Sequence, residues 1–454
     1  MKHSDAETIA AIATPVGLGG IGIVRLSGPQ ATQLLSKVFF SPKVSSGLKS
    51  HRLYHGWIGS AQNKIDEVLV SFMAGPNSYT GEDVVEISCH GGRLVVDKIL
   101  ELILVAGARL AEKGEFTKRA FLNGRLDLAQ AEAVVDLISA KSGPALAAAS
   151  AQLAGELSLR IKSIRERLVK LLSRIEASID FPDDLAAVDK KQATKTIVGA
   201  GAEITRLLAL AEEGRLVREG VRVAIIGKPN VGKSSLLNRL AQDDRAIVSP
   251  LPGTTRDTIE EAVTLGGLSL VLIDTAGLRP AGDQVEAAGI GRTLDEIKKA
   301  DIILLVVDAS AQLSGADDRA LLEAGEGGVI IVFNKIDLGR KAAESFGGER
   351  PKFMISALSG VGVADLKKGI VDNLPGGNNF EEVSRGVINT RHKECLFRAQ
   401  ESLQKIMVGL DAGVPQDLIA IDVRGAIIAL GEISGEQVSE EVIEQIFQNF
   451  CVGK

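Results

Sequence analysis

Short apolar runs and helical repeats are mixed at the start of the chain. Runs over residues 21–26, 67–74 and 84–88 predict strands, and apolar positions over residues 93–106 recur at helical spacing and predict a helix. The mixture predicts an α+β domain over residues 1–118. A glycine-rich stretch over residues 17–22 precedes a strand, whereas a dinucleotide-binding loop follows one, so this stretch predicts a tight turn instead.

On both sides of a central region, over residues 119–216 and 378–454, the apolar positions follow a helical period. One predicted helix carries a seam that steps by threes and fours. Its members are Leu157, Ile161, Ile164, Leu168, Leu171, Ile175 and Ile179. Further helices are predicted over residues 195–213, where Gly214 ends the helix, and over residues 393–410, 418–430 and 439–450. The simplest architecture is one helical domain interrupted by an inserted domain.

The inserted region, residues 217–377, repeats an apolar run followed by a polar loop. Runs over residues 221–226, 270–273, 329–333 and 353–355 predict buried strands, and residues 235–240 predict an amphipathic helix. Buried strands that alternate with helices form parallel sheets. The predicted fold is therefore multidomain, α/β plus all-α: an α+β domain, a discontinuous helical domain and an inserted α/β domain.

A phosphate-binding loop follows the first of these strands. Residues 227–234 match the pattern G-x-x-x-x-G-K-S between a strand and a helix. The glycines let successive N–H groups converge on an anion, and the helix N-terminus adds partial positive charge. Lys233 can reach the outer phosphates, and the hydroxyl of Ser234 can ligate Mg²⁺.

Three later motifs, each after an apolar run, indicate guanine as the base. Asp274 opens Asp-Thr-Ala-Gly at a strand end, where an acid can hold the Mg²⁺ shell and Gly277 lets its N–H approach the γ-phosphate. Asn334 opens Asn-Lys-Ile-Asp, whose Asp337 offers two acceptors to the adjacent donors of guanine, which adenine lacks. Residues 356–358 can offer backbone N–H groups to the guanine oxygen. Four motifs in this order predict a GTPase.

Composition changes this picture little. The chain has 454 residues, 45% hydrophobic and 24% charged, and its formal net charge of −6 gives no overall basic character. No apolar run approaches the ~18 residues of a membrane helix, and the first residues do not resemble a signal peptide, so no membrane association is expected. Cys89, Cys395 and Cys451 are widely separated, which predicts neither disulfides nor zinc and fits the cytoplasm.

A stripe of arginines lies beside the seam of the predicted helix. It consists of Arg160, Arg167 and Arg174. A solvated helix face is the commoner explanation for such a stripe, and an RNA-phosphate patch is the alternative.

Several longer segments resemble the MnmE (TrmE) family of tRNA-modification GTPases, within the TrmE-Era-EngA-like superfamily. They lie at residues 77–83, 90–92, 114–117, 119–128, 253–257 and 451–454, and the resemblance extends along the whole chain. It implies a folate-binding, dimerising N-terminal domain over residues 1–118 and an inserted Ras-like domain. It also implies a homodimer that works with the flavoprotein MnmG (GidA), in a heterotetramer, on C5 of the wobble uridine (U34) of certain tRNAs. The one-carbon unit comes from a tetrahydrofolate derivative, 5-formyl- or 5,10-methylene-tetrahydrofolate, and the group added is carboxymethylaminomethyl or aminomethyl.

The resemblance implies further ligands for two metal ions. Thr255 joins Ser234 on Mg²⁺. Asn230 binds K⁺, with Ser249, Leu251 and Thr254 in the loop that wraps this ion, mostly through backbone carbonyls. K⁺ beside the phosphates would offset developing charge, as an arginine finger does in other GTPases. The full set of predicted GTP contacts is Asn230, Val231, Gly232, Lys233, Ser234, Ser235, Ser249, Thr254, Thr255, Asp274, Thr275, Ala276, Gly277, Asn334, Lys335, Asp337, Ser356, Ala357 and Leu358.

The catalytic residue implied by the resemblance is Glu286. Ras-like enzymes place a water-orienting Gln just after Asp-x-x-Gly, and Leu278 at that position cannot orient water. Glu286 can position the attacking water directly or through a second water. From the residues alone, a surface acid at the start of a helix is an equally good explanation of Glu286.

The folate contacts implied by the resemblance are Arg25, Glu86, Arg125 and Lys454. A carboxylate such as Glu86 can accept the paired donors of a pterin ring, and arginines suit the glutamate tail. For Cys451 a nucleophile and a packing role are both open, because no histidine neighbours it in sequence.

Three functions compete at this point. The first is a GTPase whose cycle drives wobble-uridine modification. The second is a ribosome-assembly GTPase that binds RNA and uses GTP as a timer, and the third is a folate enzyme regulated by GTP. No G-x-x-G clamp of the KH type is found in the C-terminal part of the sequence, which favours the first over the second.

Overall fold

The computed structural model describes residues 7–15, 17–42, 47–60, 62–184, 188–243, 260–265, 268–274, 299–325, 327–342, 345–374 and 388–454. By compactness the chain divides into two units, Met1–Val135 with Gly431–Lys454, and Asp136–Leu430. The domain boundaries predicted from the sequence stay predictions. None of the described helices combines the length and the apolar character that a membrane crossing requires.

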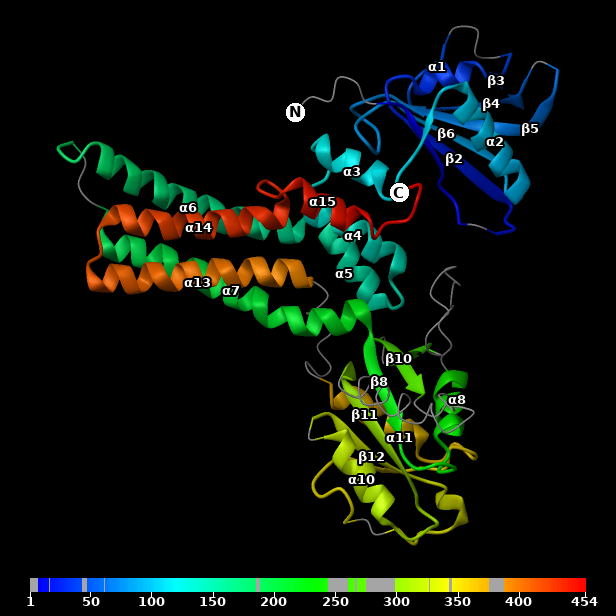
Figure 1. Ribbon diagram of the computed structural model, residues 1–454, viewed down its shortest axis with the longest axis vertical. Helices are drawn as coiled ribbons and strands as arrows, with labels where there is room; N and C mark the ends of the chain where they lie inside the picture. Colours follow the sequence, from blue (N-terminus) through cyan, green and yellow to red (C-terminus); the bar gives the residue numbers. More distant parts are fainter. Residues whose placement is uncertain are drawn as a thin grey trace, which may run out of the picture. The chain divides into compact units, whose positions relative to one another are not determined.

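The first unit is built on a seven-stranded sheet of order β3-β4-β5-β6-β2-β1-β7, in which only β1 and β7 pair in parallel (Figure 1). Helices α1 (Ala31–Ser36) and α2 (Arg93–Ala106) share its apolar core. The strands are β1 (Ile9–Ile12), β2 (Ile21–Ser27), β3 (Phe39–Phe40), β4 (Arg52–Gly59), β5 (Lys64–Met73), β6 (Val84–His90) and β7 (Arg109–Leu110). The three predicted strands and the predicted helix of this region are confirmed.

A buried carboxylate anchors helix α3 (Glu115–Leu122) to this sheet. Glu115 accepts hydrogen bonds from Arg109 Nη2 at 2.5 Å, Arg119 Nη2 at 2.9 Å and the N–H of Glu112 at 2.8 Å. Arg119 also pairs with Glu82 at 3.0 Å. Burial raises the pKa of Glu115, but these hydrogen bonds, first that from Arg109, outweigh it and hold the pKa below its usual range.

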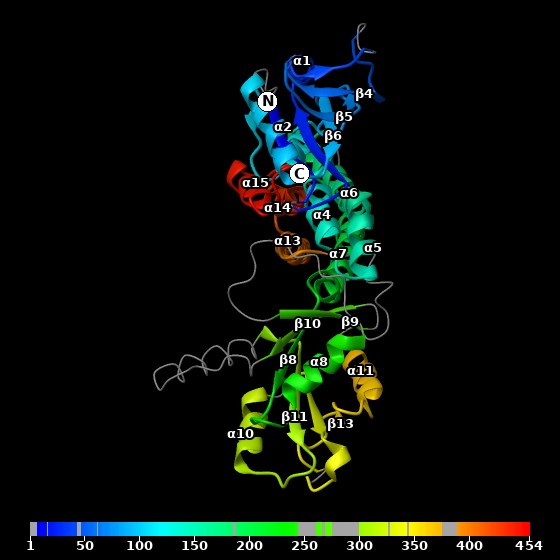
Figure 2. The ribbon, with the colours of Figure 1, turned by 90° about the vertical axis from the view of Figure 1, so that its right-hand side faces the viewer.

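Helices from both flanks of the inserted region pack together in the second unit. Figures 1 and 2 show α13 (Thr390–Ala412) beside α7 (Lys190–Glu219), which in turn packs on α6 (Glu156–Asp180). The helical domain is therefore discontinuous in sequence, as predicted. The remaining helices outside the inserted sheet are α4 (Leu128–Ser139), α5 (Gly143–Leu153), α14 (Gln416–Ser434) and α15 (Glu440–Phe447).

The predicted seam of α6 is confirmed except at its end, and one predicted helix stop is wrong. Every seam residue from Leu157 to Ile175 is buried, whereas Ile179 is 42% exposed in the last turn. Helix α7 does not stop at Gly214 and ends only at Gly220. One interior glycine costs about 1 kcal/mol, which the burial of Leu216 and Val217 in the next turn offsets.

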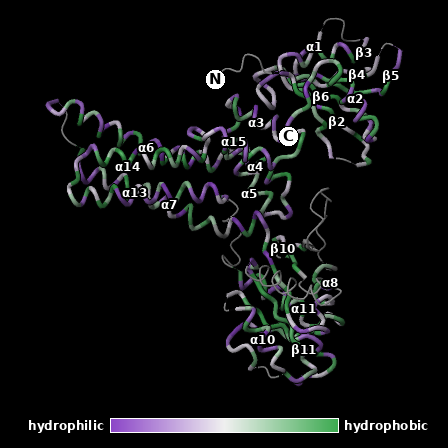
Figure 3. The backbone as a smooth tube through the Cα atoms, viewed as in Figure 1, coloured by the Kyte–Doolittle hydropathy of each residue, from purple (hydrophilic) through white to green (hydrophobic). Residues whose placement is uncertain are grey.

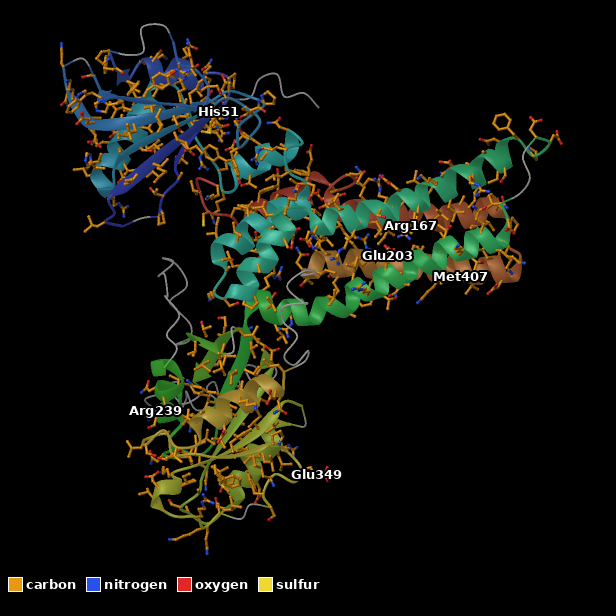
Figure 4. All side chains as sticks on the ribbon, turned by 180° about the vertical axis from the view of Figure 1, so that it is seen from behind. His51, Arg167, Glu203, Arg239, Glu349 and Met407 are labelled. Carbon is orange, nitrogen blue, oxygen red and sulfur yellow. The ribbon has the colours of Figure 1, made fainter. Side chains whose placement is uncertain are left out.

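The central arginine of the predicted stripe is paired. Arg167 donates from Nη2 to Glu203 Oε2 at 2.7 Å, and Figure 4 shows these two side chains together between α6 and α7. Arg160 and Arg174 are exposed. A paired and solvated face accounts for the stripe without RNA, and the RNA interpretation stays untested.

The inserted domain is a six-stranded sheet of order β13-β12-β11-β8-β10-β9, parallel except for β9. This is the arrangement of a Ras-like domain, and Figure 3 shows its strands as hydrophobic segments. The strands are β8 (Val221–Ile226), β9 (Glu260–Leu265), β10 (Leu268–Asp274), β11 (Ile302–Asp308), β12 (Val329–Asn334) and β13 (Lys352–Met354). The helices are α8 (Lys233–Asp243), α10 (Gly315–Ala324), α11 (Val363–Asp372) and the 3₁₀ turn η1 (Ile336–Leu338). The four predicted strands are confirmed.

Glu115→Gln should destabilise the first unit at pH 7 by about 2 kcal/mol, because it removes the charge of a buried carboxylate that accepts hydrogen bonds from two arginines. A carboxyl group with a lowered pKa stabilises the fold above its unfolded pKa of about 4.3, and this contribution is lost as the pH falls through the folded value. The difference between wild type and variant should therefore shrink below about pH 4.

Urea unfolding can be followed by the fluorescence of Trp57, the only tryptophan of the chain, which lies in this unit. Glu112→Gln is the matched control, since that side chain is exposed in the same turn. If Glu115→Gln lowers the free energy of unfolding by the same amount at every pH, the role given to Glu115 is contradicted.

Candidate functional site

The phosphate loop joins β8 to α8 through two glycines that no other residue can replace without a shift. A Cβ on Gly227, at φ +140°, would lie 2.3 Å from Val306 O, and one on Gly232, at φ +99°, would lie 2.2 Å from Asn334 Nδ2. The loop therefore passes against two neighbouring strands. This close passage positions it at the carboxyl ends of the strands, where open α/β sheets bind ligands.

Lys233 spans the inside of this loop. Its Nζ donates to the carbonyls of Gly227 at 2.8 Å and Lys228 at 2.7 Å, and the residue is buried. Ser234 and Ser235 follow at the exposed start of α8. The ammonium, the helix N-terminus and the exposed hydroxyl of Ser234 form a donor set that fits a phosphate and its Mg²⁺.

Asn334 ties the phosphate loop to a second loop. Its Nδ2 donates to Val231 O at 2.8 Å, and its Oδ1 accepts from the N–H of Ala357 at 2.9 Å. Asn334 is 2% exposed, so these bonds are shielded from water. The residue thus holds the predicted base-binding segments in one place.

The other base-site residues surround this tie. Asp337 is exposed in η1, three positions after Asn334. In residues 356–358, the N–H groups of Ser356 and Ala357 bond to Val361 O and Asn334 Oδ1, and Leu358 is exposed at the outer end. Two of the three N–H groups predicted for guanine therefore hold the loop itself.

Lys335 and Asn230 meet across the site. Lys335 donates from Nζ to Asn230 O at 2.6 Å and to Asp308 Oδ2 at 2.7 Å. The sequence interpretation did not include Asp308, although it ends an apolar run just as Asp274 does. The side chain of Asn230 is exposed at the turn of the loop, and its amide oxygen is a suitable ligand for a monovalent cation.

A second ion pair on the loop was also not predicted. Lys228 Nζ lies 2.6 Å from Asp317 Oδ2 and 3.0 Å from Ser314 Oγ at the start of α10. Asp317 is 2% exposed and completes a capping box with Ser314. The pair fixes the outer side of the phosphate loop to the neighbouring helix.

The remaining predicted GTP, metal and catalytic residues lie outside the described part of the chain. They are Ser249, Leu251, Thr254, Thr255, Thr275, Ala276, Gly277 and Glu286. Asp274 is the last residue of β10 and pairs with Ile225 of β8, which brings its backbone beside the strand that leads into the phosphate loop.

In the first unit the four predicted folate residues converge. Arg25 and Glu86 lie opposite each other on β2 and β6, with Arg25 Nε donating to Glu86 Oε1 at 2.8 Å. The ring of Tyr79, which was not predicted as a site residue, contacts two guanidinium groups. Its centroid lies 5.6 Å from Arg25 Cζ and 5.3 Å from Arg125 Cζ.

The C-terminal tail completes this second site. Arg25 Nη1 donates to Gly453 O at 3.3 Å, and Val452 forms an antiparallel bridge with Lys113. Gly453 has φ +95°, and a Cβ there would lie 2.2 Å from Ile12 O, so the tail fits only with glycine. Burial, and then the charge of Arg25, lower the pKa of Lys454. Two arginines and a lysine beside one carboxylate form a site for an anion that also carries hydrogen-bond donors.

Two family models match this chain along most of its length. Residues 128–451 match a family model described as "MnmE helical domain", and residues 8–125 match "GTP-binding protein TrmE N-terminus". Curated relatives named tRNA modification GTPase MnmE include those of Moorella thermoacetica and Symbiobacterium thermophilum, each 48% identical over 99% of both chains. Another, from Enterococcus faecalis, is 45% identical over 99% of this chain and 98% of its own length.

Proposed function

This chain belongs to the MnmE family of tRNA modification GTPases, and on that premise we propose the following chemistry for its two sites. It is a GTP hydrolase that acts in tRNA modification. With the flavoprotein MnmG it adds a carboxymethylaminomethyl or aminomethyl group to C5 of U34 in certain tRNAs. A tetrahydrofolate derivative supplies the one-carbon unit. The protein forms a homodimer through its N-terminal domain, and the reaction takes place in the cytoplasm. The observation that carries the proposal is a phosphate loop and a separate cationic site in one chain.

In this proposal each predicted residue of the nucleotide domain has a role. Lys233 and the loop amides bind the phosphates, Ser234 and Thr255 would hold Mg²⁺, and Asp337 selects guanine. Mg²⁺ when bound would neutralise charge on the β- and γ-phosphates. The support is the position of Lys233 inside the loop and of Asn334 between the loops.

The proposed cation site lies at the turn of Asn230, the residue that the resemblance to the family assigns to K⁺. The carbonyl of Asn230 is bonded to Lys335, and its exposed side-chain amide oxygen is the ligand proposed for K⁺. K⁺ there, wrapped by the loop of Ser249, Leu251 and Thr254, would offset negative charge that develops during hydrolysis. Glu286 orients the attacking water, because Leu278 cannot.

GTP hydrolysis should be fast in K⁺ and slow in Na⁺, whose smaller radius fits the same oxygens poorly. Asn230→Ala should lose the K⁺ response and still bind nucleotide through the remaining loop amides. Glu286→Ala should bind GTP normally and turn over about 100-fold more slowly or worse. Steady-state rates of GTP hydrolysis in K⁺ and in Na⁺ check the expected turnover of the wild type and of both variants.

Asn230→Gly is the control for backbone strain, since glycine accepts the left-handed turn that alanine resists. If Asn230→Gly keeps the K⁺ response while Asn230→Ala loses it, the side chain is not the ligand. A wild type that is indifferent to the cation, or a Glu286→Ala variant with near-normal turnover, would overturn the mechanism.

The first unit binds the folate in this proposal. Glu86 accepts the donors of the pterin ring, and Arg25, Arg125 and Lys454 hold its carboxylates. Their convergence around Tyr79 and the C-terminal tail supports the assignment. Cys451 is exposed at the start of this tail, and its role stays open.

Arg125→Ala should weaken the binding of 5-formyl-tetrahydrofolate about tenfold or more, because a charge-assisted hydrogen bond is lost. The affinity of Arg125→Lys should lie between those of the wild type and Arg125→Ala, since lysine keeps the charge and loses the planar geometry. Calorimetric titration of the full chain measures both affinities, with Arg160→Ala, an exposed arginine of α6, as the control. Unchanged affinity in both Arg25→Ala and Arg125→Ala would remove folate from this site.

Nucleoside analysis of tRNA tests the function as a whole. A strain that lacks this gene should lose the modified wobble uridine, and the wild-type gene should restore it. Lys233→Ala should not restore it, whereas Lys162→Ala, an exposed lysine of α6, should. Unchanged nucleosides in the deletion strain, together with a defect in ribosome assembly, would favour the timer GTPase instead.

A further inference from the structure

Two residues of the nucleotide domain share an unusual backbone conformation and are bonded to each other. In the described part of this domain, Asn230 and Lys335 are the non-glycine residues with left-handed φ, each at +65°. Such a conformation costs energy and persists where surrounding contacts hold it. Lys335 Nζ bonds to the carbonyl of Asn230 at 2.6 Å, so the base motif and the phosphate loop are joined where both are strained.

Asp308 is the second acceptor of that ammonium. It is the last residue of β11, and its register partner on the neighbouring strand β12 is Asn334, directly before Lys335. Its Oδ2 lies 2.7 Å from Lys335 Nζ, and the two side chains are 19% and 29% exposed. Partial burial keeps this bond from being screened as a surface pair would be.

The two carboxylate oxygens of Asp308 have separate partners. Oδ1 accepts from the N–H of Ser310 at 2.9 Å and from Ser310 Oγ at 2.6 Å, while Oδ2 accepts from Lys335. Burial opposes the charged form, but bonds from Lys335 and Ser310 outweigh it and hold the pKa of Asp308 below its usual range. The carboxylate is therefore fixed by its own turn before it meets the lysine.

We propose that Asp308 is a positioning residue for GTP binding: it holds the Lys335 ammonium against Asn230 O and thereby fixes the phosphate loop to the base motif. A turn cap alone would need only Oδ1. The second oxygen directs the lysine across the site, so that the two left-handed residues are set before nucleotide arrives. Without this acceptor, Lys335 would gain rotamer freedom that binding would have to remove.

The test is a double-mutant cycle on GDP affinity, measured by calorimetry with the full chain. In Asp308→Asn the amide oxygen can still accept from Ser310, while its NH₂ group faces the ammonium and cannot accept from it. The dissociation constant should rise about tenfold. Lys335→Met should raise it as well, and adding Asp308→Asn to Lys335→Met should change nothing further. Asp308→Glu, which keeps the carboxylate, should recover most of the affinity.

Asp301→Asn is the matched control at the other end of the same strand. Asp301 is also a largely buried carboxylate, bonded to Arg215 Nη2 at 2.5 Å and to the N–H of Arg222 at 2.8 Å, on the far side from the loop. The Asp301→Asn variant should have a lower unfolding temperature than the wild type and an unchanged affinity for GDP. If Asp308→Asn does not fold, Asp308→Ser takes its place, because it keeps a cap for residue 310 without a charge.

Independent, multiplicative effects of Asp308→Asn and Lys335→Met would overturn the proposal. So would unchanged GDP affinity in Asp308→Asn, or a loss in Asp301→Asn as large as that in Asp308→Asn. Whichever of these results is obtained, binding of GDP by the wild type still supports the proposed nucleotide site. A failure of the proposal for Asp308 can therefore be distinguished from a failure of the GTPase assignment.

Discussion

The carbonyl groups of the phosphate loop need hydrogen-bond donors, and the way they obtain them organises the nucleotide domain. A loop that turns its N–H groups toward an anion cannot pair its carbonyls as a helix or a sheet does, and a buried carbonyl without a partner is costly. Three side chains from two motifs supply those donors. Lys233 bonds Gly227 and Lys228, Lys335 bonds Asn230, and Asn334 bonds Val231. The residues that recognise phosphate and base therefore also build the loop.

The same constraint explains why the site has a rigid outer side. Lys228 is fixed by Asp317, which is itself capped at the start of α10. Lys335 is fixed by Asp308, at the end of β11. Lys228 and Lys335 are thus each matched by a carboxylate at a strand end or helix start, where backbone N–H groups hold the acid in place.

Buried charge plays the corresponding role in the first unit. Glu115 holds Arg109 and Arg119, and Arg119 continues to Glu82. Helix α3 is thereby fixed beside the sheet that carries Arg25, and the C-terminal tail pairs with the segment just before α3. In the folded unit the end of the chain therefore lies at a site that is formed mostly by residues more than 300 positions earlier.

The sequence by itself determined the elements and the motifs, because both depend on local patterns. Buried strands such as β8 and β12 are unbroken apolar runs, and the seam of α6 is an apolar repeat at helical spacing. The phosphate loop is a motif of consecutive residues. Tertiary structure decided what no local pattern contains. It decided that α7 continues past Gly214, because Leu216 and Val217 are buried by distant residues. It also decided that Asp308 meets Lys335, because that contact exists only once β11 and β12 are paired in register. The contacts of Tyr79 with Arg25 and Arg125 likewise join segments that are distant in the sequence and meet only in the folded unit.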